Sequence, residues 1–250
     1  MRVFMSDLDN TLIYSYKHEI GEEKTCVEIY QDREISYMTN RSCKLLKAVK
    51  EEVLFVPTTT RTKEQYDRIQ FGIGILKYAL VCNGGILLID GREDPRWYQE
   101  SAQLVADCQA ELEKAQHCLE NDENRSMELR NIRDLFLFTK SEKPYQSTKR
   151  LKEILNLSLV EVFQNGVKVY VVPKKLSKGM AVSRLKKRLG AELVIAAGDS
   201  EFDLPMLQEA DLAIAPKELT DKYKIREDIV GMDGKGIFSD QMLEYILSKW

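Results

Sequence analysis

Two aspartates, Asp7 and Asp9, follow a short apolar segment at residues 2–6. Side chains alternate along an extended chain, so Asp7, Asp9 and Thr11 are predicted to lie on one side of it. Two carboxylates held close together raise the pKa of one of them, whereas a divalent cation stabilises the ionised form. The spacing therefore predicts a nucleophile or metal ligand beside a general acid, although a solvated loop could carry the same residues.

Three further apolar segments end in polar residues that could join this pair. These residues are Thr58 to Thr62, Asn83 to Gly85, and Gly198 to Asp203. Ligands of open parallel sheets bind at the carboxyl ends of the strands, so we expect the three groups at one crevice. Carboxylates from two different strands, Asp7 and Asp199, suit the oxygen ligation that Mg²⁺ prefers.

Most of these residues also have a structural explanation. The threonines from Thr58 to Thr60 could form an ordinary turn, and Lys178, at the start of a basic helix, could be a surface lysine. The segment from Ser200 to Asp203 fits a helix capping box, which needs no chemistry. Their joint position at the strand ends of one predicted sheet favours a functional site.

The rest of the sequence predicts an α/β fold with a doubly wound parallel sheet. Buried apolar runs alternate with amphipathic segments, as is typical of parallel sheets with right-handed crossovers. The expected strands are 2–6, 53–57, 78–83, 193–199 and 211–216, and the expected helices are 40–52, 62–73, 177–190, 202–210 and 240–249.

The stretch from 87 to 172 interrupts this alternation. It contains a polar helix over about 98–120 and two β runs, 159–163 and 167–172, with a glycine in the turn between them. Adjacent β runs joined in this way indicate a hairpin. We therefore predict an α+β domain at 87–172, inserted into a discontinuous core domain of residues 1–86 and 173–250. Another small hairpin is expected within residues 14–38, where it could shape the entrance to the site.

The composition argues against several function classes. Lys and Arg total 37 against 40 Asp and Glu, and a net charge of -3 gives no global attraction to nucleic acid or to an anionic membrane. No run approaches the ~18 apolar residues that span a bilayer. The five cysteines lack CxxC spacing, and the two histidines lack partners at zinc-ligand spacing. We therefore expect reduced thiols, no zinc site and a cytoplasmic protein.

The order and spacing of these residues resemble a known family. The segments Asp7-Leu8-Asp9-Asn10-Thr11, Thr59, Lys178 and Gly198-Asp199-Ser200-Glu201-Phe202-Asp203 are similar to the four motifs of the haloacid dehalogenase superfamily phosphatases. Cys82-Asn83-Gly84-Gly85 resembles the segment after the third strand in the Cof-like and sucrose-phosphatase-like branch. That branch has a Rossmann-like core and an α+β type IIB cap between its second and third motifs, and the predicted domain at 87–172 occupies that interval.

The resemblance implies a role for each matching residue. Asp7 would be the nucleophile that becomes an aspartyl phosphate, and Asp9 would protonate the leaving alcohol and later activate water. Thr59 would hydrogen-bond a phosphoryl oxygen, and Lys178 would offset the repulsion between Asp7 and the phosphate. Further candidates for substrate binding are Thr60, Arg61 and Asn83.

The cofactor that the resemblance implies is Mg²⁺. It would be held by Asp7, the backbone carbonyl of Asp9, and Asp199. Asp203 would be a further metal ligand, or it would orient the metal's waters and Lys178. The second aspartate of the first motif, Asp9, favours phosphoryl transfer over dehalogenation.

The implied activity is that of a Mg²⁺-dependent phosphomonoesterase acting on a small phosphorylated metabolite, with a sugar phosphate as the expected class by analogy. A phosphosugar mutase on the same scaffold and a noncatalytic phosphometabolite-binding protein are the alternatives. We expect no nucleic-acid or membrane partner, and a monomer or small homo-oligomer. Two positions depart from the family pattern, because Thr60 stands where relatives often have Gly and Phe202 where many have Asn.

Overall fold

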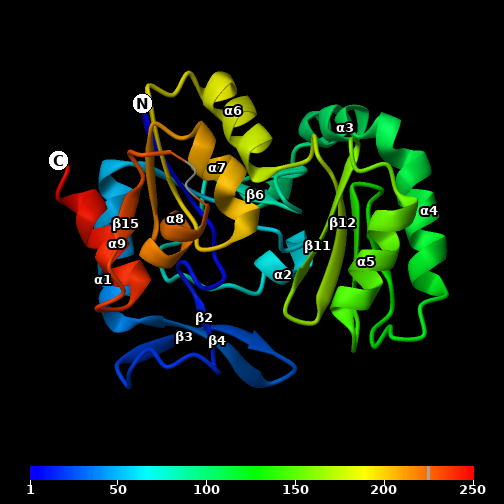
Figure 1. The fold of residues 1–250 in the computed structure, drawn as a ribbon. Coiled ribbons are helices and arrows are strands. Elements are labelled where there is room, and N and C mark those ends of the chain that lie inside the picture. The colour runs from blue at the N-terminus through cyan, green and yellow to red at the C-terminus, as the bar shows by residue number, and fades with distance from the viewer. Residues whose placement is uncertain (224–225) are drawn as a thin grey trace. The chain divides into compact units, whose positions relative to one another are not determined.

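The computed structural model describes residues 1–223 and 226–250, which form two compact units (Figure 1). The core unit consists of Met1–Asp94 and Lys178–Trp250, and the inserted unit consists of Pro95–Ser177. The observed boundaries differ from the predicted ones by eight residues at the first (95 against 87) and five at the second (177 against 172). The first boundary moves because residues 86–93 form strands that pair with a strand of the core unit.

A five-stranded parallel sheet is the centre of the core unit. Its order is β15-β14-β13-β1-β5, and each of its neighbouring pairs is parallel. The strands are β1 (Arg2–Ser6), β5 (Leu54–Pro57), β13 (Leu193–Ala197), β14 (Leu212–Pro216) and β15 (Val230–Met232). Apolar runs without polar alternation form the central strands because a parallel sheet is covered on both faces.

Helices cover both faces of this sheet. Helix α1 (Asn40–Glu52) connects β1 to β5, whereas α7 (Leu204–Glu209) connects β13 to β14 in the opposite direction across the sheet. Right-handed crossovers then place α1 and α7 on opposite faces. The other helices of the unit that follow the insertion are α6 (Lys178–Leu189), α8 (Lys217–Tyr223) and α9 (Phe238–Leu247). Helix α9 packs against α1, and α6 packs against α7, so the doubly wound fold class is confirmed.

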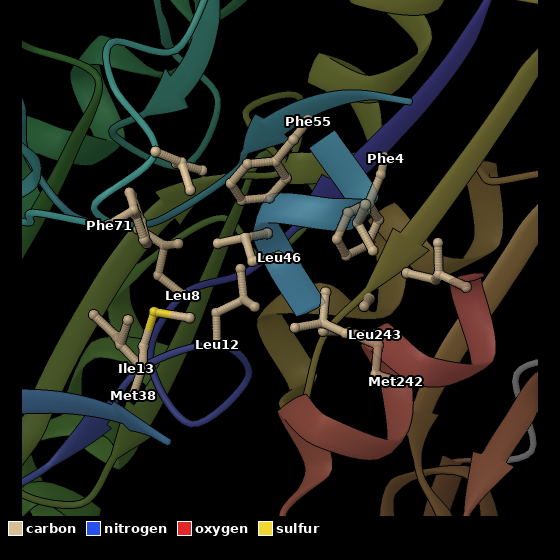
Figure 2. Close-up of a cluster of buried hydrophobic side chains, with 14 of the residues drawn as sticks. Phe4, Leu8, Leu12, Ile13, Met38, Leu46, Phe55, Phe71, Met242 and Leu243 are labelled. Atoms are coloured by element: carbon tan, nitrogen blue, oxygen red, sulfur yellow. The ribbon is translucent and has the colours of Figure 1, made fainter. Parts of the chain in front are cut away.

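The face under α1 and α9 contains a continuous apolar core (Figure 2). Phe4 on β1 lies 5.5 Å from Phe55 on β5, measured between ring centroids, and Phe55 meets Phe71 edge to face at 6.2 Å. Leu46 from α1 and Met242 from α9 complete the contact. This core holds β1 and β5 in register, and so fixes the ends from which Asp7 and Thr59 follow.

Two small antiparallel sheets extend the core unit. One has the order β6-β7-β8, with strands β6 (Tyr78–Val81), β7 (Ile86–Ile89) and β8 (Arg92–Glu93). A single parallel bridge between Thr58 and Leu80 aligns β6 beside the end of β5. The other has the order β2-β4-β3, with strands β2 (Tyr14–Ser15), β3 (Lys24–Tyr30) and β4 (Arg33–Thr39), and it confirms the hairpin expected within residues 14–38.

The helix predicted over residues 62–73 is much shorter in the structure. Helix α2 covers Lys63–Tyr66, and the chain then continues without helix. The Gln70 N–H donates to the Val27 carbonyl of β3 at 2.7 Å, and Gly72 and Gly74 adopt positive φ. Pairing with the hairpin and glycine turns therefore replace the predicted helix, although the apolar side chains at 69–73 remain in the core.

The inserted unit is an α+β layer. Its antiparallel sheet has the order β11-β12-β10-β9, with strands β9 (Arg130–Ile132), β10 (Phe136–Lys140), β11 (Val160–Asn165) and β12 (Lys168–Pro173). Its helices are α3 (Pro95–Leu104), the 3₁₀ turn η1 (Ala106–Cys108), α4 (Gln109–Glu120) and α5 (Pro144–Ile154). The single helix predicted over 98–120 is divided at η1, where Val105 and Cys108 turn inward and are fully buried.

No helix in the described part of the chain combines the length and the apolar character needed to cross a membrane.

The central role of Phe55 in this core can be tested by truncation. Phe55 is 1% exposed, so Phe55→Ala should lower the free energy of unfolding by about 3–5 kcal/mol, the usual cost of an aromatic cavity. Ile75→Ala is the matched control, because Ile75 is 79% exposed and its truncation should change stability by less than about 0.5 kcal/mol. Urea unfolding of the three proteins measures both values, and equal stability of Phe55→Ala and wild type would contradict this packing.

Candidate active site

A lysine buried between two aspartates is at the centre of the candidate site. The Lys178 ammonium donates to Asp7 Oδ1 at 2.5 Å and to Asp203 Oδ1 at 2.6 Å, and Lys178 is 1% exposed. Asp7 follows β1, Lys178 begins α6, and Asp203 ends the 3₁₀ turn η2 (Glu201–Asp203). Three segments distant in sequence therefore meet at one ammonium, and Lys178 is not the surface lysine that its sequence context allowed.

Asp203 is held rigidly where β13 leads into α7. Its Oδ1 accepts from Lys178, and its Oδ2 accepts from the Asp199 N–H at 3.2 Å and from the N–H and hydroxyl of Ser200 at 3.0 and 2.8 Å. A Cβ at Gly198 would collide with the Asp203 side chain, so this approach requires glycine. The capping interaction expected between Ser200 and Asp203 is confirmed, and it coexists with the bond to Lys178.

Asp199 completes a cluster of three carboxylates. Carboxylate oxygens of Asp7, Asp199 and Asp203 all lie within 4.8 Å of one another. The Thr11 hydroxyl donates to Asp199 Oδ1 at 3.1 Å and is 3.5 Å from Asp7 Oδ2. The end of β1 and the end of β13 therefore face the same point, as expected for neighbouring parallel strands.

The electrostatics of this cluster favour an additional positive charge. Burial raises the pKa of Asp7 well above its ordinary value, and the nearby carboxylates raise it further while Lys178 opposes the shift. Burial, followed by the charge of Asp203, raises the pKa of Asp199 to about 7. Burial alone would lower the pKa of Lys178, but Asp203 and Asp7 outweigh it and raise that pKa. The ammonium therefore stays charged while the carboxylates resist ionisation.

The residues of the cluster fit a hard divalent cation. Three ionised carboxylates and one ammonium would leave a charge of -2, which matches the charge of Mg²⁺. The donors are oxygens, the ligand type that Mg²⁺ prefers. Because Asp203 already accepts four hydrogen bonds, Asp7 and Asp199 are the side chains better suited to ligate the metal.

Thr59 and Asn83 lie on adjoining strand ends. Ser6 pairs with Pro57, so the residues after β1 and after β5 are neighbours. The Thr59 hydroxyl accepts the Arg61 N–H at 3.1 Å, and the Asn83 N–H donates to the Thr59 carbonyl at 3.0 Å. Both side chains are buried, whereas Thr60 is half-buried on the same loop. A hydroxyl that accepts one bond can donate its own hydrogen to an anion.

The carboxylate of Asp9 lies outside the cluster, unlike the arrangement expected from simple alternation. Asn10 adopts a φ of 61°, and the N–H groups of Thr11, Leu12 and Ile13 all donate to the Leu8 carbonyl, so the chain turns after Leu8. The turn directs Thr11 toward Asp7. Asp9 instead accepts two hydrogen bonds from Arg61, at 2.7 and 2.8 Å.

Glu28 is a residue that the sequence reasoning did not single out. It lies on β3, its side chain is fully buried, and it forms an ion pair with Arg61 at 2.9 Å. A lone acidic residue in a short β run is an ordinary surface residue by pattern. Only its burial connects it to the site.

Comparisons with known proteins assign the chain to a family. A family model described as haloacid dehalogenase-like hydrolase matches residues 91–233, more than half of the chain. Phosphoglycolate phosphatase of Methanopyrus kandleri is 27% identical over 171 residues, covering 66% of this chain and 71% of the relative. Phosphoglycolate phosphatase 2 of Saccharolobus solfataricus is 26% identical over 200 residues, covering 78% and 77%.

The fold is also shared with a solved structure. The sucrose-phosphatase from Synechocystis sp. PCC6803, determined with sucrose and phosphate, superposes with a TM-score of 0.67 over 99% of this chain and 98% of that one. The sequence identity is 18%, so this likeness concerns the fold. The match of the family model decides the assignment: the chain belongs to the haloacid dehalogenase-like hydrolase family.

Proposed function

We propose that this protein is a Mg²⁺-dependent phosphomonoesterase that forms an aspartyl phosphate on Asp7. The observation that carries the proposal is the buried Lys178 ammonium between Asp7 and Asp203, with Asp199 in the same cluster. A fully buried, charged lysine is costly to fold unless it is paired, and here its partner is the proposed nucleophile. Such an arrangement is more than a solvated loop would need.

The chemistry has two halves. In the first, a carboxylate oxygen of Asp7 attacks phosphorus, the bond between phosphorus and the leaving oxygen breaks, and Asp9 gives its proton to the leaving alcohol. In the second, water attacks the phosphorus of the aspartyl phosphate, Asp9 accepts the proton of that water, and the Asp7 carboxylate is released with inorganic phosphate. Asp9 returns to its protonated form, so the two halves balance.

A carboxylate attacking a phosphate dianion must overcome charge repulsion. Lys178 lies on Asp7 and supplies a fixed positive charge in a dry environment, where such charges act strongly. Thr59 would donate to a phosphoryl oxygen, with Thr60, Arg61 and Asn83 as further substrate contacts. Mg²⁺ bound by Asp7, Asp199 and the Asp9 carbonyl would supply Lewis acidity and neutralise charge, and Asp203 would orient Lys178 and the ligand set.

We propose a small phosphorylated metabolite as the substrate. The curated relatives are named for phosphoglycolate and the solved relative for sucrose phosphate, which supports small polar phosphomonoesters and leaves a sugar phosphate as our default. The inserted unit would serve as the cap that selects the leaving group. Release of free phosphate without an isomeric product would exclude the mutase, and binding without turnover across a panel of phosphorylated metabolites would exclude both enzymes.

The role of Asp7 predicts a large loss of activity on a nearly isosteric change. Asp7→Asn should lower kcat for p-nitrophenyl phosphate with Mg²⁺ by at least about 1,000-fold, because removal of a nucleophile typically costs that much or more. Asp90→Asn is the matched control, since Asp90 is an exposed aspartate in a surface ion pair with Lys77. The control should keep wild-type turnover. Equal phosphate release by Asp7→Asn and wild type would remove Asp7 from this role.

The raised pKa of Asp199 predicts a pH-dependent gain of stability on its neutralisation. Its pKa is about 7 in the folded, metal-free protein and ~3.9 in an unfolded chain, so ionisation opposes folding as pH rises from ~4 to ~7. Asp199→Asn should therefore raise Tm at pH 8 without metal by at least about 2 °C, and the gain should vanish near pH 4. The Asn oxygen can still accept the Thr11 bond.

The same two proteins test the metal. MgCl₂ should raise the Tm of the wild type at pH 8, because binding to the folded state stabilises it by mass action. It should raise the Tm of Asp199→Asn far less, since one of the proposed ligands has lost its charge. Differential scanning fluorimetry measures all four conditions, and an equal Mg²⁺ shift in both proteins would show that Asp199 does not hold the ion.

A further inference from the structure

Glu28 is an acidic side chain buried in the hairpin that precedes α1. The residue is 1% exposed although it lies on β3, a short strand with exposed residues on either side of its centre. The register between β3 and β4 shifts at Glu28, which is the signature of a β-bulge. Bulges redirect side chains, and here the register shifts on both sides of Glu28, which stays paired with Ser36 and whose carboxylate is buried.

The Glu28 carboxylate is fully compensated. Its Oε1 lies 2.9 Å from Arg61 Nη1 and 2.9 Å from Arg68 Nη2, and its Oε2 accepts the Ser36 hydroxyl at 2.6 Å. An unpaired buried carboxylate would destabilise the fold strongly, so these contacts are what allow the acid to remain there. Glu28 is therefore fixed from both sides, by the arginines and by the neighbouring strand.

Arg61 connects this buried acid to Asp9. Its Nε and Nη2 donate to the two oxygens of Asp9 at 2.8 and 2.7 Å, while its Nη1 faces Glu28. The Arg61 side chain is 13% exposed, whereas the Asp9 side chain is 50% exposed. A bidentate guanidinium fixes the plane of a carboxylate as well as its position. The orientation of the exposed Asp9 is thus set by a buried cation that is itself held by Glu28.

The hairpin is attached to the same part of the core unit. Glu28 forms an antiparallel bridge with Ile69, and the Gln70 N–H donates to the Val27 carbonyl at 2.7 Å. The Glu28 backbone is therefore anchored to the segment that follows α2, close in sequence to both arginines. Glu28 has a defined place from which to hold Arg61.

We infer that Glu28 is a positioning residue that acts through Arg61 to orient Asp9 for the hydrolysis half of the reaction. The inference rests on the proposed function, because it assigns to Asp9 the acceptance of the proton from water. Both oxygens of Asp9 accept from Arg61, which would hold the carboxylate in the orientation from which it accepts the proton of the attacking water. Without Glu28, Nη1 of Arg61 keeps the long 3.4 Å bond to the Gln65 carbonyl but loses its ionic partner, and Asp9 samples orientations unsuited to that transfer.

This role has a kinetic signature that a loss of folding does not share. With an aryl phosphate the leaving group needs little help, so we expect hydrolysis of the aspartyl phosphate to limit turnover. Slower hydrolysis lowers kcat and KM by the same factor and leaves kcat/KM unchanged. At a substrate concentration below the wild-type KM, it also increases the fraction of enzyme that carries a phosphoryl group. A smaller fraction of folded enzyme lowers kcat and kcat/KM together and leaves KM unchanged.

The test compares Glu28→Gln with Arg41→Gln on p-nitrophenyl phosphate at saturating Mg²⁺. Arg41 is an exposed arginine of α1 that forms an ion pair with Glu244, so Arg41→Gln breaks an ion pair of the same unit outside the proposed site and serves as the matched control. Acid quench during turnover followed by intact-protein mass spectrometry measures the phosphorylated fraction. We expect Glu28→Gln to lower kcat and KM together by about tenfold, with more phosphoenzyme at a substrate concentration below the wild-type KM, and Arg41→Gln to leave the three quantities unchanged.

Two further variants keep the test decisive if Glu28→Gln folds poorly. Ser36→Ala removes the hydroxyl that donates to Glu28 Oε2 and should show the same parallel fall in kcat and KM in a weaker form. Arg61→Lys replaces the bidentate guanidinium by a point charge and should show the full parallel fall in kcat and KM. Adding Glu28→Gln to Arg61→Lys should slow the enzyme no further.

The possible outcomes separate this inference from the proposed function. A fall in kcat at constant KM, an unchanged phosphoenzyme level below the wild-type KM, or the same effect in Arg41→Gln would overturn the role of Glu28 while leaving Asp7 as the nucleophile. Wild-type turnover by Asp7→Asn in the same assay would overturn the proposed function, and the role of Glu28 with it.

Discussion

The ammonium of Lys178 is the point on which the site depends. A buried lysine keeps its charge only when opposite charges surround it, and here Asp7 and Asp203 both lie within hydrogen-bond distance. This requirement fixes where α6 begins relative to β1 and β13. Two close approaches serve the same end, because a side chain at Gly179 would collide with the Pro205 backbone and one at Gly198 with Asp203. The packing of α6 against α7 and the geometry around the proposed nucleophile are therefore one arrangement.

The cluster of charged residues lowers the stability of the fold, and the packed sheet beneath the cluster supplies the compensating stability. Three carboxylates gather around one ammonium, and burial raises the pKa values of Asp7 and Asp199, so ionisation of these groups opposes folding in the absence of a cation. The strands that carry them are buried on both faces, and the apolar core around Phe4 and Phe55 holds their ends together. Residues arranged for chemistry commonly lower the stability of the fold that carries them. Here the excess negative charge suits the site to a divalent cation.

Local patterns predicted most of the fold and most of the residues at the site. Apolar runs and the polar residues at their ends predicted strand β1, the capping pair of Ser200 and Asp203, and the joint position of Asp7, Lys178 and Asp199. The predictions that differ from the structure concern segments whose conformation is set by contacts with distant parts of the chain. The helix after Thr62 is short because Gln70 pairs with β3. The Asp9 carboxylate lies outside the cluster because the chain turns at Asn10. The role we infer for Glu28 depends on a bulge and two arginines, none of which has a pattern of its own.

A covalent step at Asp7 is the centre of the proposed mechanism. An acyl phosphate is reduced by borohydride to an alcohol, so an aspartyl phosphate at this position would be converted into homoserine. Enzyme mixed with p-nitrophenyl phosphate and Mg²⁺, quenched during turnover, reduced and mapped by peptide mass spectrometry should contain homoserine at position 7, and enzyme treated without substrate should not. An unmodified Asp7, in a sample that releases phosphate at the normal rate, would contradict the account.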